Sequence, residues 1–497
     1  MRQRQMYREV FMKHHTENKD GKQNGKSEGL INGTRVSRHA FLLLPFAFLL
    51  LTCGAFAQTG KPTPRVESDR GRFDTLRTEG FEALYNLDYE VARRRFREVA
   101  REYPDHPAGP QFLAASLWIQ TLNESRRLQA SLYNTESFYA KTEEKTDPKI
   151  VAQFRELTRQ AKSLAEARVK RDPKDVEAIY YLGAVEALKA AFAAAVERSY
   201  ISALRSGQDS VDRHRDVLKI DPAYHDAEIS IGMYDYVVST LPLPVKILAT
   251  VGGVRGSKKR GLETLARVAR EGKWARDDAR VLLIGLFKRE KRFTDALGLA
   301  RELAAKYPRN YLFKMETADA LVSQAAVERA TNPAATTTAE REAFAIFDSL
   351  LQREQTPQGR STASSAAQRP LDLIHYSYGE ALFVAGHLER AAKEFLAAGT
   401  IAGAEPNLAT MSRLRAAQTL DLAGKRDEAL AQYRTVLARP NIYDAHEVAK
   451  RGLREPYRKP AAITTNTNGT GSNAGNMGSV DNVSEASSGE GQKKNEK

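Results

Sequence analysis

Residues 80–104 read GFEALYNLDYEVARRRFREVAREYP, and this stretch decides the fold. In its second half a small residue, Ala92, is followed four positions later by Phe96 and three positions after that by Val99. These offsets place the three side chains on one face of an α-helix. The small residue lets a second helix approach, and the aromatic ring fills the groove beside it. Pro104 then ends the helix, because proline lacks the N–H group that a helix interior needs.

The same pattern occurs three more times along the chain. The copies are Phe293–Ala296 followed by Ala300, Leu303 and Pro308; Leu388–Ala391 followed by Phe395 and Ala398; and Arg426–Ala429 followed by Tyr433 and Val436. Any helical hairpin can show one such match, but repetition at spaced positions indicates a repeat array. We therefore expect an all-α fold in which each helical hairpin buries its apolar face against the next.

The four copies resemble the tetratricopeptide repeat, whose second helix carries small, aromatic, small and proline positions in this order. Gly80 lies twelve residues before Ala92, where that family places a glycine, and Gly379 lies twelve residues before Ala391. The copies depart from the family pattern because none has its tryptophan near the start and only two have the proline. The resemblance implies an α-solenoid of about six hairpins over residues 70–458, with a concave groove wide enough for a peptide or a helix.

In tetratricopeptide proteins the partner contacts come from the first helix of each hairpin. The resemblance therefore implies a partner-binding role for the aromatic residues expected on those helices. These are Tyr85, Trp118, Tyr180, Tyr234 and Tyr378. Packing in the core is an equally good explanation for each of them.

A second internal similarity has a longer period. Asp172-Pro173 and Gly183 recur as Asp221-Pro222 and Gly232, with the same offset of 49 residues. Aspartate followed by proline is a helix start signal, with aspartate as the cap and proline at the first helical position. Residues 123–170 and 184–218 read as long amphipathic or alanine-rich helices. We expect hairpins here with lengthened helices, so that the array over residues 70–327 is thickest at its centre.

The C-terminal third divides into three parts. Residues 328–370 are predicted to interrupt the array with a short helix around Ala339–Gln352 and a mobile loop rich in serine and threonine. Residues 371–458 are expected to form the C-terminal hairpins. After Lys459 the composition changes to Asn, Gly, Ser and Thr. Such a segment buries too little apolar surface to offset its ordering entropy, so residues 459–497 are predicted to be disordered.

The N-terminus is typical of an export signal. Basic residues precede an apolar run from Ala40 to Leu51, and small residues follow at Ala55 and Ala57. Twelve helical residues reach only about 18 Å, short of the ~30 Å hydrocarbon core, so a signal peptide over residues 1–57, cleaved after Ala57, is favoured over a spanning anchor. Residues 58–69 would then be a linker.

The leader leaves two alternatives open. Cys53 follows Leu-Leu-Thr, which is similar to the lipidation motif of bacterial lipoproteins except that threonine precedes the cysteine. Lipidation of Cys53, with an outer-membrane location, is therefore the rival to cleavage after Ala57. The leader is also unusually long, and a translation start near Val36 would give it a conventional length.

The segment from Leu241 to Gly261 is the most unusual in the chain. An apolar stretch broken by prolines leads into glycines and a basic cluster, and its cations are Lys246, Arg255, Lys258, Lys259 and Arg260. Ser257 is placed to cap a following helix. Cations at a helix N-terminus oppose the helix dipole, so either nearby carboxylates offset them or an anion or membrane surface binds there. An irregular packed connection is the favoured explanation.

The charge of the chain is mildly basic. The formal charge is +14, of which +5 lies in residues 1–57. An excess of +9 over some 440 residues is typical of mixed-charge helices, so no nucleic-acid partner is predicted. Arg93, Arg97 and Arg101 form a basic stripe at four-residue spacing on the first repeat. A solvated helix face explains this stripe better than a docking site for an acidic partner does.

No catalytic constellation is evident. The nine histidines have no partners at metal-ligand spacing, and the single cysteine lies in the leader. The sequence also lacks a nucleophile elbow and a phosphate loop of correct spacing. We therefore predict no enzyme activity, no cofactor, no metal and no small-molecule substrate.

These observations favour an exported scaffold, in the periplasm or cell envelope, that holds a protein or peptide in its groove. The alternative is an envelope assembly factor that lies on a membrane surface through residues 241–261.

Overall fold

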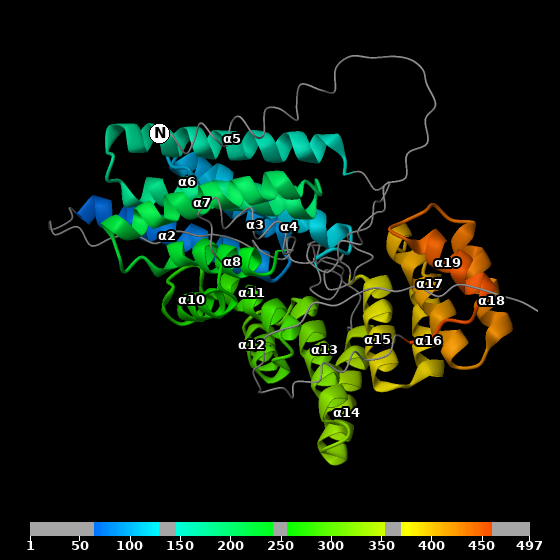
Figure 1. The fold of residues 1–497 in the computed structure, drawn as a ribbon. Helices are drawn as coiled ribbons and strands as arrows, with labels where there is room; N and C mark the ends of the chain where they lie inside the picture. Colours follow the sequence, from blue (N-terminus) through cyan, green and yellow to red (C-terminus); the bar gives the residue numbers. More distant parts are fainter. Residues whose placement is uncertain (1–63, 129–145, 242–255, 353–368, 460–497) are drawn as a thin grey trace, which may run out of the picture. The chain divides into compact units, whose positions relative to one another are not determined.

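The computed structural model describes residues 64–128, 146–241, 256–352 and 369–459 (Figure 1). Residues 64–457 of these belong to one compact unit, and of the second unit, Arg458–Lys497, only Arg458 and Lys459 are described. All regular structure in the described ranges is helical. The export signal, Cys53, residues 353–368 and the tail beyond Lys459 lie outside the described residues.

The described residues form a series of helices in chain order. Their bounds are α2 Pro64–Tyr85, α3 Tyr89–Glu102, α4 Ala108–Glu124, α5 Pro148–Arg171, α6 Val176–Ala195, α7 Tyr200–Ile220, η4 His225–Ala227, α8 Glu228–Ser239, α10 Lys258–Glu271, α11 Arg276–Arg289, α12 Phe293–Lys306, α13 Tyr311–Glu328, α14 Pro333–Leu351, α15 Leu371–Ala385, α16 Leu388–Ala398, α17 Pro406–Leu422, α18 Arg426–Leu437 and α19 Ala445–Arg454. Each helix packs on the next along the chain (Figure 1). The fold is an all-α solenoid of tetratricopeptide-like hairpins, as predicted.

The small-and-aromatic pattern works as the sequence indicates. Ala92, Phe96 and Val99 on α3 are fully buried. A Cβ atom at Gly80 of α2 would lie 2.3 Å from the Phe96 ring, so only glycine lets α2 approach α3 this closely. Gly379 of α15 meets Phe395 of α16 in the same way, at 2.7 Å. The glycine and the aromatic are therefore the two halves of one helix–helix contact.

The central helices are lengthened, as expected: α5 has 24 residues, α6 has 20 and α7 has 21. Residues 184–218 are not continuous helix, because α6 ends at Ala195 and α7 begins at Tyr200. The predicted start signals are wrong, however. Asp172 is the C-cap of α5 and Asp221 the C-cap of α7, so each Asp-Pro pair lies in the turn after a helix. The side chain of Asp175 caps α6 instead, by accepting a hydrogen bond from the Ala178 N–H group. Proline in these turns stops one helix rather than starting the next.

The short helix expected at Ala339–Gln352 is a full helix of 19 residues, α14. It begins six residues earlier, where Asn332 accepts a hydrogen bond from the N–H group of Ala335 and Pro333 occupies the first turn. Helix α14 packs on α13 and α15, and Phe347 of α14 is buried. The repeat array therefore continues through residues 333–351 instead of breaking there.

Candidate functional site

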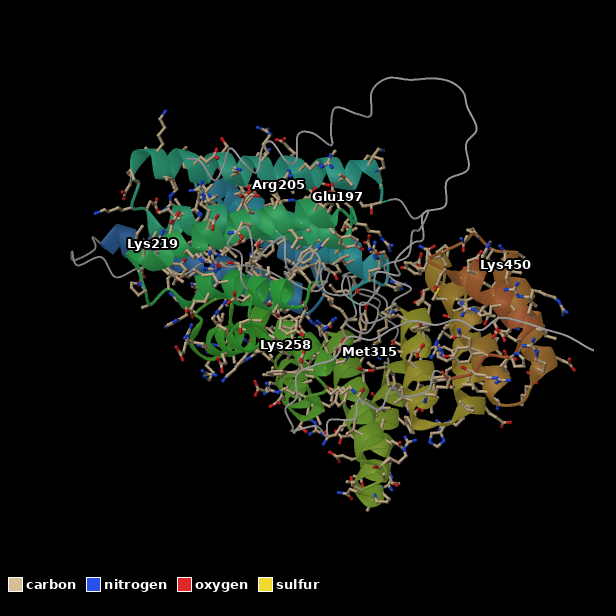
Figure 2. All side chains as sticks on the ribbon, viewed as in Figure 1. Glu197, Arg205, Lys219, Lys258, Met315 and Lys450 are labelled. Carbon is tan, nitrogen blue, oxygen red and sulfur yellow. The ribbon has the colours of Figure 1, made fainter. Side chains whose placement is uncertain are left out.

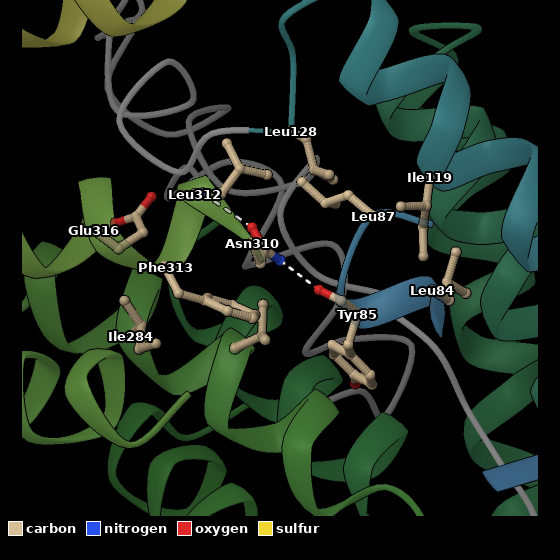
Figure 3. A pocket seen from close by; sticks show the side chains of 11 residues that line it. Leu84, Tyr85, Leu87, Ile119, Leu128, Ile284, Asn310, Leu312, Phe313 and Glu316 are labelled. Carbon is tan, nitrogen blue, oxygen red and sulfur yellow. Dashed lines mark hydrogen bonds between the residues drawn. The ribbon is translucent and has the colours of Figure 1, made fainter. Parts of the chain in front are cut away.

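The candidate site is a small apolar pocket between elements far apart in sequence (Figure 3). Its volume is about 50 Å³. Its walls come from α2, α4 and the residues just after each of them, and from α11 and α13. The lining residues are Leu84, Tyr85, Leu87, Ile119, Leu128, Val281, Ile284, Asn310, Leu312, Phe313 and Glu316. Asn310 and Glu316 are polar, and Tyr85 carries a hydroxyl, so most of the wall is hydrocarbon.

Direct hydrogen bonds hold the first hairpins against the later ones at this pocket. The Asn310 side-chain amide donates to the Tyr85 carbonyl at 2.7 Å, and the dashed line in Figure 3 marks this contact. The Tyr311 hydroxyl donates to the Asn123 side-chain oxygen at 2.6 Å. Beside them the ring of Tyr85 stacks on that of Tyr307, with centroids 4.7 Å apart. The pocket therefore exists only when the chain folds back on its own first repeat.

A buried acidic cluster lies behind Tyr85. The Tyr85 hydroxyl donates to the carboxyl group of Asp278, and burial raises the pKa of Asp278 well above its usual range. The adjacent Asp277 differs. Burial opposes its ionisation, but hydrogen bonds from Lys306 and Tyr307, each 2.5 Å long, outweigh this and lower its pKa. Asp226 accepts hydrogen bonds from the backbone N–H groups of Trp274 and Ala275, just before α11, and burial raises the pKa of Asp226.

A buried lysine lies next to the pocket wall formed by Glu316. Lys288 of α11 contacts Glu316 and Asp319 of α13, each at 2.5 Å. Burial alone would lower the pKa of Lys288, but the two carboxylates outweigh burial and raise it. Breaking such a buried pair costs several kcal/mol, so it fixes the angle between two helices that line the pocket.

A second hollow runs between α5, α6 and α7, with a volume of about 380 Å³. Its floor includes Phe154 and Phe192, whose rings stack with centroids 3.8 Å apart. The cations on its wall are matched by carboxylates. Arg155 pairs with Glu197, which Figure 2 labels, and Lys162 and Lys189 both pair with Glu186. The hollow is therefore close to electrically balanced.

Most of the aromatic residues proposed from sequence are in the core. Trp118, Tyr180 and Tyr378 are at most 2% exposed, which favours the core-packing alternative for them. Tyr234 is half-buried. Tyr85 is the member of this group that lines the apolar pocket.

The basic stripe on α3 is a partly paired helix face. Arg93 pairs with Glu90 and also donates to Gln120. Arg101 is exposed and lies 3.5 Å from Glu102. Arg97 is exposed. The arrangement agrees with the solvated-face explanation.

The basic cluster in the first turn of α10 is offset by carboxylates. Ser257 caps the helix, as predicted, by accepting from the Arg260 N–H group at 3.3 Å. Lys258, labelled in Figure 2, lies 2.9 Å from Glu290, and Arg260 forms a two-pronged pair with Asp235. Lys259 is 86% exposed and 3.9 Å from Glu263. Lys246 and Arg255 lie outside the described residues.

No group of three His, Cys, Asp or Glu residues in the described part of the chain could hold a metal ion. One helix among the described residues, α6, is long and apolar enough to cross a membrane, but 94% of its apolar window is buried inside the protein. Burial of this kind is what the central helix of a thick repeat array requires.

No family model matches the chain, and no curated protein matches it. Among solved structures, the human IFIT1 dimer with PPP-AAAA is 11% identical, with 78% of this chain and 85% of that chain covered and a TM-score of 0.40. An IFIT1 monomeric mutant with Gppp-AAAA is 12% identical, with 77% and 85% covered and a TM-score of 0.42.

The prediction that excluded a nucleic-acid partner is corrected by these comparisons. The similar structures are complexes of IFIT1 with PPP-AAAA, m7Gppp-AAAA and Gppp-AAAA. The exclusion rested on a mild average charge, and average charge does not report how side chains are arranged on a surface.

Proposed function

We propose that this protein is a non-catalytic binding scaffold, and that the pocket beside Tyr85 takes an apolar side chain from a bound protein segment. The observation that supports this is an apolar pocket whose walls are fixed by buried hydrogen bonds and an ion pair. Pre-formed pockets that accept an aliphatic or aromatic anchor are the usual centres of binding energy in protein interfaces. A rigid wall limits the ordering cost on binding.

The size of the pocket suits one side chain rather than a cofactor. A volume of about 50 Å³ is small beside the ~300–1,000 Å³ typical of small-molecule sites. Burying a leucine, isoleucine or phenylalanine side chain contributes ~1.5–3 kcal/mol. Additional affinity would then come from contacts outside the pocket, along the helices that border it.

The location remains part of the proposal. Export rests on the apolar run and the small residues of the leader, Ala40–Leu51, Ala55 and Ala57. The membrane-surface alternative has less support, because Lys258 and Arg260 are engaged by Glu290 and Asp235. These ion pairs neutralise the two cations, so little net positive charge remains to attract anionic lipid.

Selection of peptides from a random library, followed by affinity measurement, tests the pocket. We expect the selected peptides to share one apolar anchor residue. Leu312→Phe, which fills the pocket, should weaken them at least tenfold. Val327→Phe adds the same ring at a position that is 65% exposed and should leave affinity unchanged. Peptides that bind the Leu312→Phe protein as well as the wild type, with thermal stability retained, would refute the assignment of this pocket.

A further inference from the structure

Two arginines of the C-terminal hairpins lie near each other, and no carboxylate of the described residues pairs with either of them. Arg439, just after α18, donates to the Thr410 hydroxyl at 2.8 Å and to the Pro406 carbonyl at 3.1 Å. Thr410 and Arg413 are three residues apart on α17, so their side chains share one helix face. The guanidinium group of Arg439 is thereby held against the part of α17 that carries Arg413.

The hydrogen bonds of these two guanidinium groups go to neutral acceptors in the described part of the chain. Arg413 donates to the Gln432 side-chain oxygen at 3.1 Å, and the acceptors of Arg439 are the Thr410 hydroxyl and the Pro406 carbonyl. The Nε atom of Arg413 is buried and has no hydrogen-bond partner. Across the described ranges of the chain, no carboxylate lies within ion-pair distance of either guanidinium group. Two positive charges therefore lie close together without compensation.

Arg415, on the same helix, has its positive charge neutralised by a carboxylate. Glu380 accepts two hydrogen bonds from its guanidinium group, at 2.6 and 2.8 Å. Burial acts against the charge of Arg415, but Glu380 outweighs it and the pKa of Arg415 is raised. For Arg413 burial and the charge of Arg439 act in the same direction, and its pKa is lowered. Among the described residues, Arg413 and Arg439 therefore have no carboxylate partner comparable to the Glu380 that pairs with Arg415.

We propose that Arg413 and Arg439 form a binding site for a phosphate group. Each guanidinium group has five N–H donors, and the hydrogen bonds described above use one from Arg413 and two from Arg439. A phosphate monoester carries a charge of about −1.5 to −2 at neutral pH, which matches two arginines, whereas one carboxylate would neutralise only half of their charge. Paired arginine forks suit phosphate oxygens because they provide parallel hydrogen bonds.

The test is the thermal midpoint of the full-length protein titrated with sodium phosphate, at ionic strength held constant with sodium chloride. A ligand that binds the folded state raises the midpoint in proportion to the logarithm of its concentration once the site is saturated. We expect this rise for the wild type and for Arg434→Gln, an exposed arginine on the same hairpin. Arg413→Gln and Arg439→Gln should abolish it.

The variants have a second readout that does not depend on phosphate. Without phosphate, Arg413→Gln should melt at or above the wild-type temperature, because it removes like-charge repulsion. Arg413→Lys keeps the charge but loses the fork, and should weaken phosphate binding at least fivefold. A loss of binding caused by misfolding would instead lower the midpoint in phosphate-free buffer.

Three results would overturn the proposal: no shift in the wild type, the same shift with sodium acetate, or an undiminished shift in Arg413→Gln. Direct calorimetric titration then identifies the source of the phosphate group. Binding of inorganic phosphate as strong as that of a phosphoserine peptide supports a free-anion site. Tighter binding of the peptide, again lost in Arg413→Gln, supports recognition of a phosphorylated protein.

Discussion

The hydroxyl of Tyr85, at the end of α2, donates a hydrogen bond to the carboxyl group of Asp278 in α11, 193 residues later in the chain. Both groups are buried, and Tyr85 also lines the apolar pocket. This hydrogen bond therefore stabilises the packing of α2 against α11 and also helps to shape the proposed binding pocket.

Tyr85→Phe should therefore destabilise the protein. The ring can still stack on Tyr307, but Asp278 loses a donor in a buried position, which costs about 1–3 kcal/mol. A urea titration followed by circular dichroism measures the loss. Tyr457→Phe is the matched control, because Tyr457 is half-buried and makes no hydroxyl bond among those described. Equal midpoints for Tyr85→Phe and wild type would show that the contact contributes nothing.

Two glycines should respond to alanine with opposite signs. A Cβ atom at Gly80 would lie 2.3 Å from the Phe96 ring, so Gly80→Ala forces α2 and α3 apart and should cost 1–3 kcal/mol, roughly the penalty of overpacking. Gly298, inside α12, has nothing within 4 Å of the same position. Gly298→Ala should stabilise the helix by about 0.5–1 kcal/mol. Thermal midpoints that move in the same direction would contradict this account.

These glycines also show how much of the fold the sequence predicts. The pairing of Gly80 with Phe96 depends on residues within one hairpin, and helix periodicity is sufficient to identify it. The error at Asp172 has a local cause too: an Asp-Pro pair suits either the end of a helix or its beginning, and the cap at Asp175 decides between them. Local patterns therefore predict the elements better than their exact ends.

The candidate site could not be predicted from the sequence. Tyr85 was identified as an aromatic on a first helix, but nothing near Asp278 or Asn310 in the chain indicates that they meet it. Their contacts depend on how far the intervening helices turn the array, which is a sum of many small packing angles. Likewise Arg413 and Arg439 are unremarkable in sequence among 76 Lys and Arg residues.

Stability should depend on pH through His214. This histidine is buried between α6 and α8, where Nδ1 contacts the Ser230 hydroxyl at 2.6 Å and Nε2 the Tyr180 carbonyl at 3.2 Å. Burial lowers the pKa of His214 to about 4, although the bond to the Tyr180 carbonyl acts in the opposite direction. The unfolded chain, with a pKa near 6.5, then binds a proton that the folded protein does not.

The sign of the effect follows from that difference. The contribution is complete above pH 6.5 and is lost as the pH falls toward 4, by roughly 3 kcal/mol in all. Urea midpoints between pH 7.5 and pH 4, about the span of that titration, should show the loss in wild type. His214→Gln should lack this component, and His387→Gln, at an exposed position, should keep it. Parallel pH profiles for wild type and His214→Gln would exclude His214 as the cause.

Lys288 forms ion pairs with both Glu316 and Asp319, and these two pairs give a prediction about the pocket wall. Lys288→Met leaves the buried Glu316 and the partly buried Asp319 without their cation, which should cost about 3–5 kcal/mol and weaken any peptide bound at the pocket. The triple variant Lys288→Met/Glu316→Gln/Asp319→Asn removes the charges together and should recover most of the loss, because the penalty arises from uncompensated charge rather than from missing attraction. Lys450→Met breaks an exposed pair with Glu447 and should change stability by less than about 1 kcal/mol. If the triple variant melted below Lys288→Met, the polar network would be stabilising through hydrogen bonds and not through charge balance.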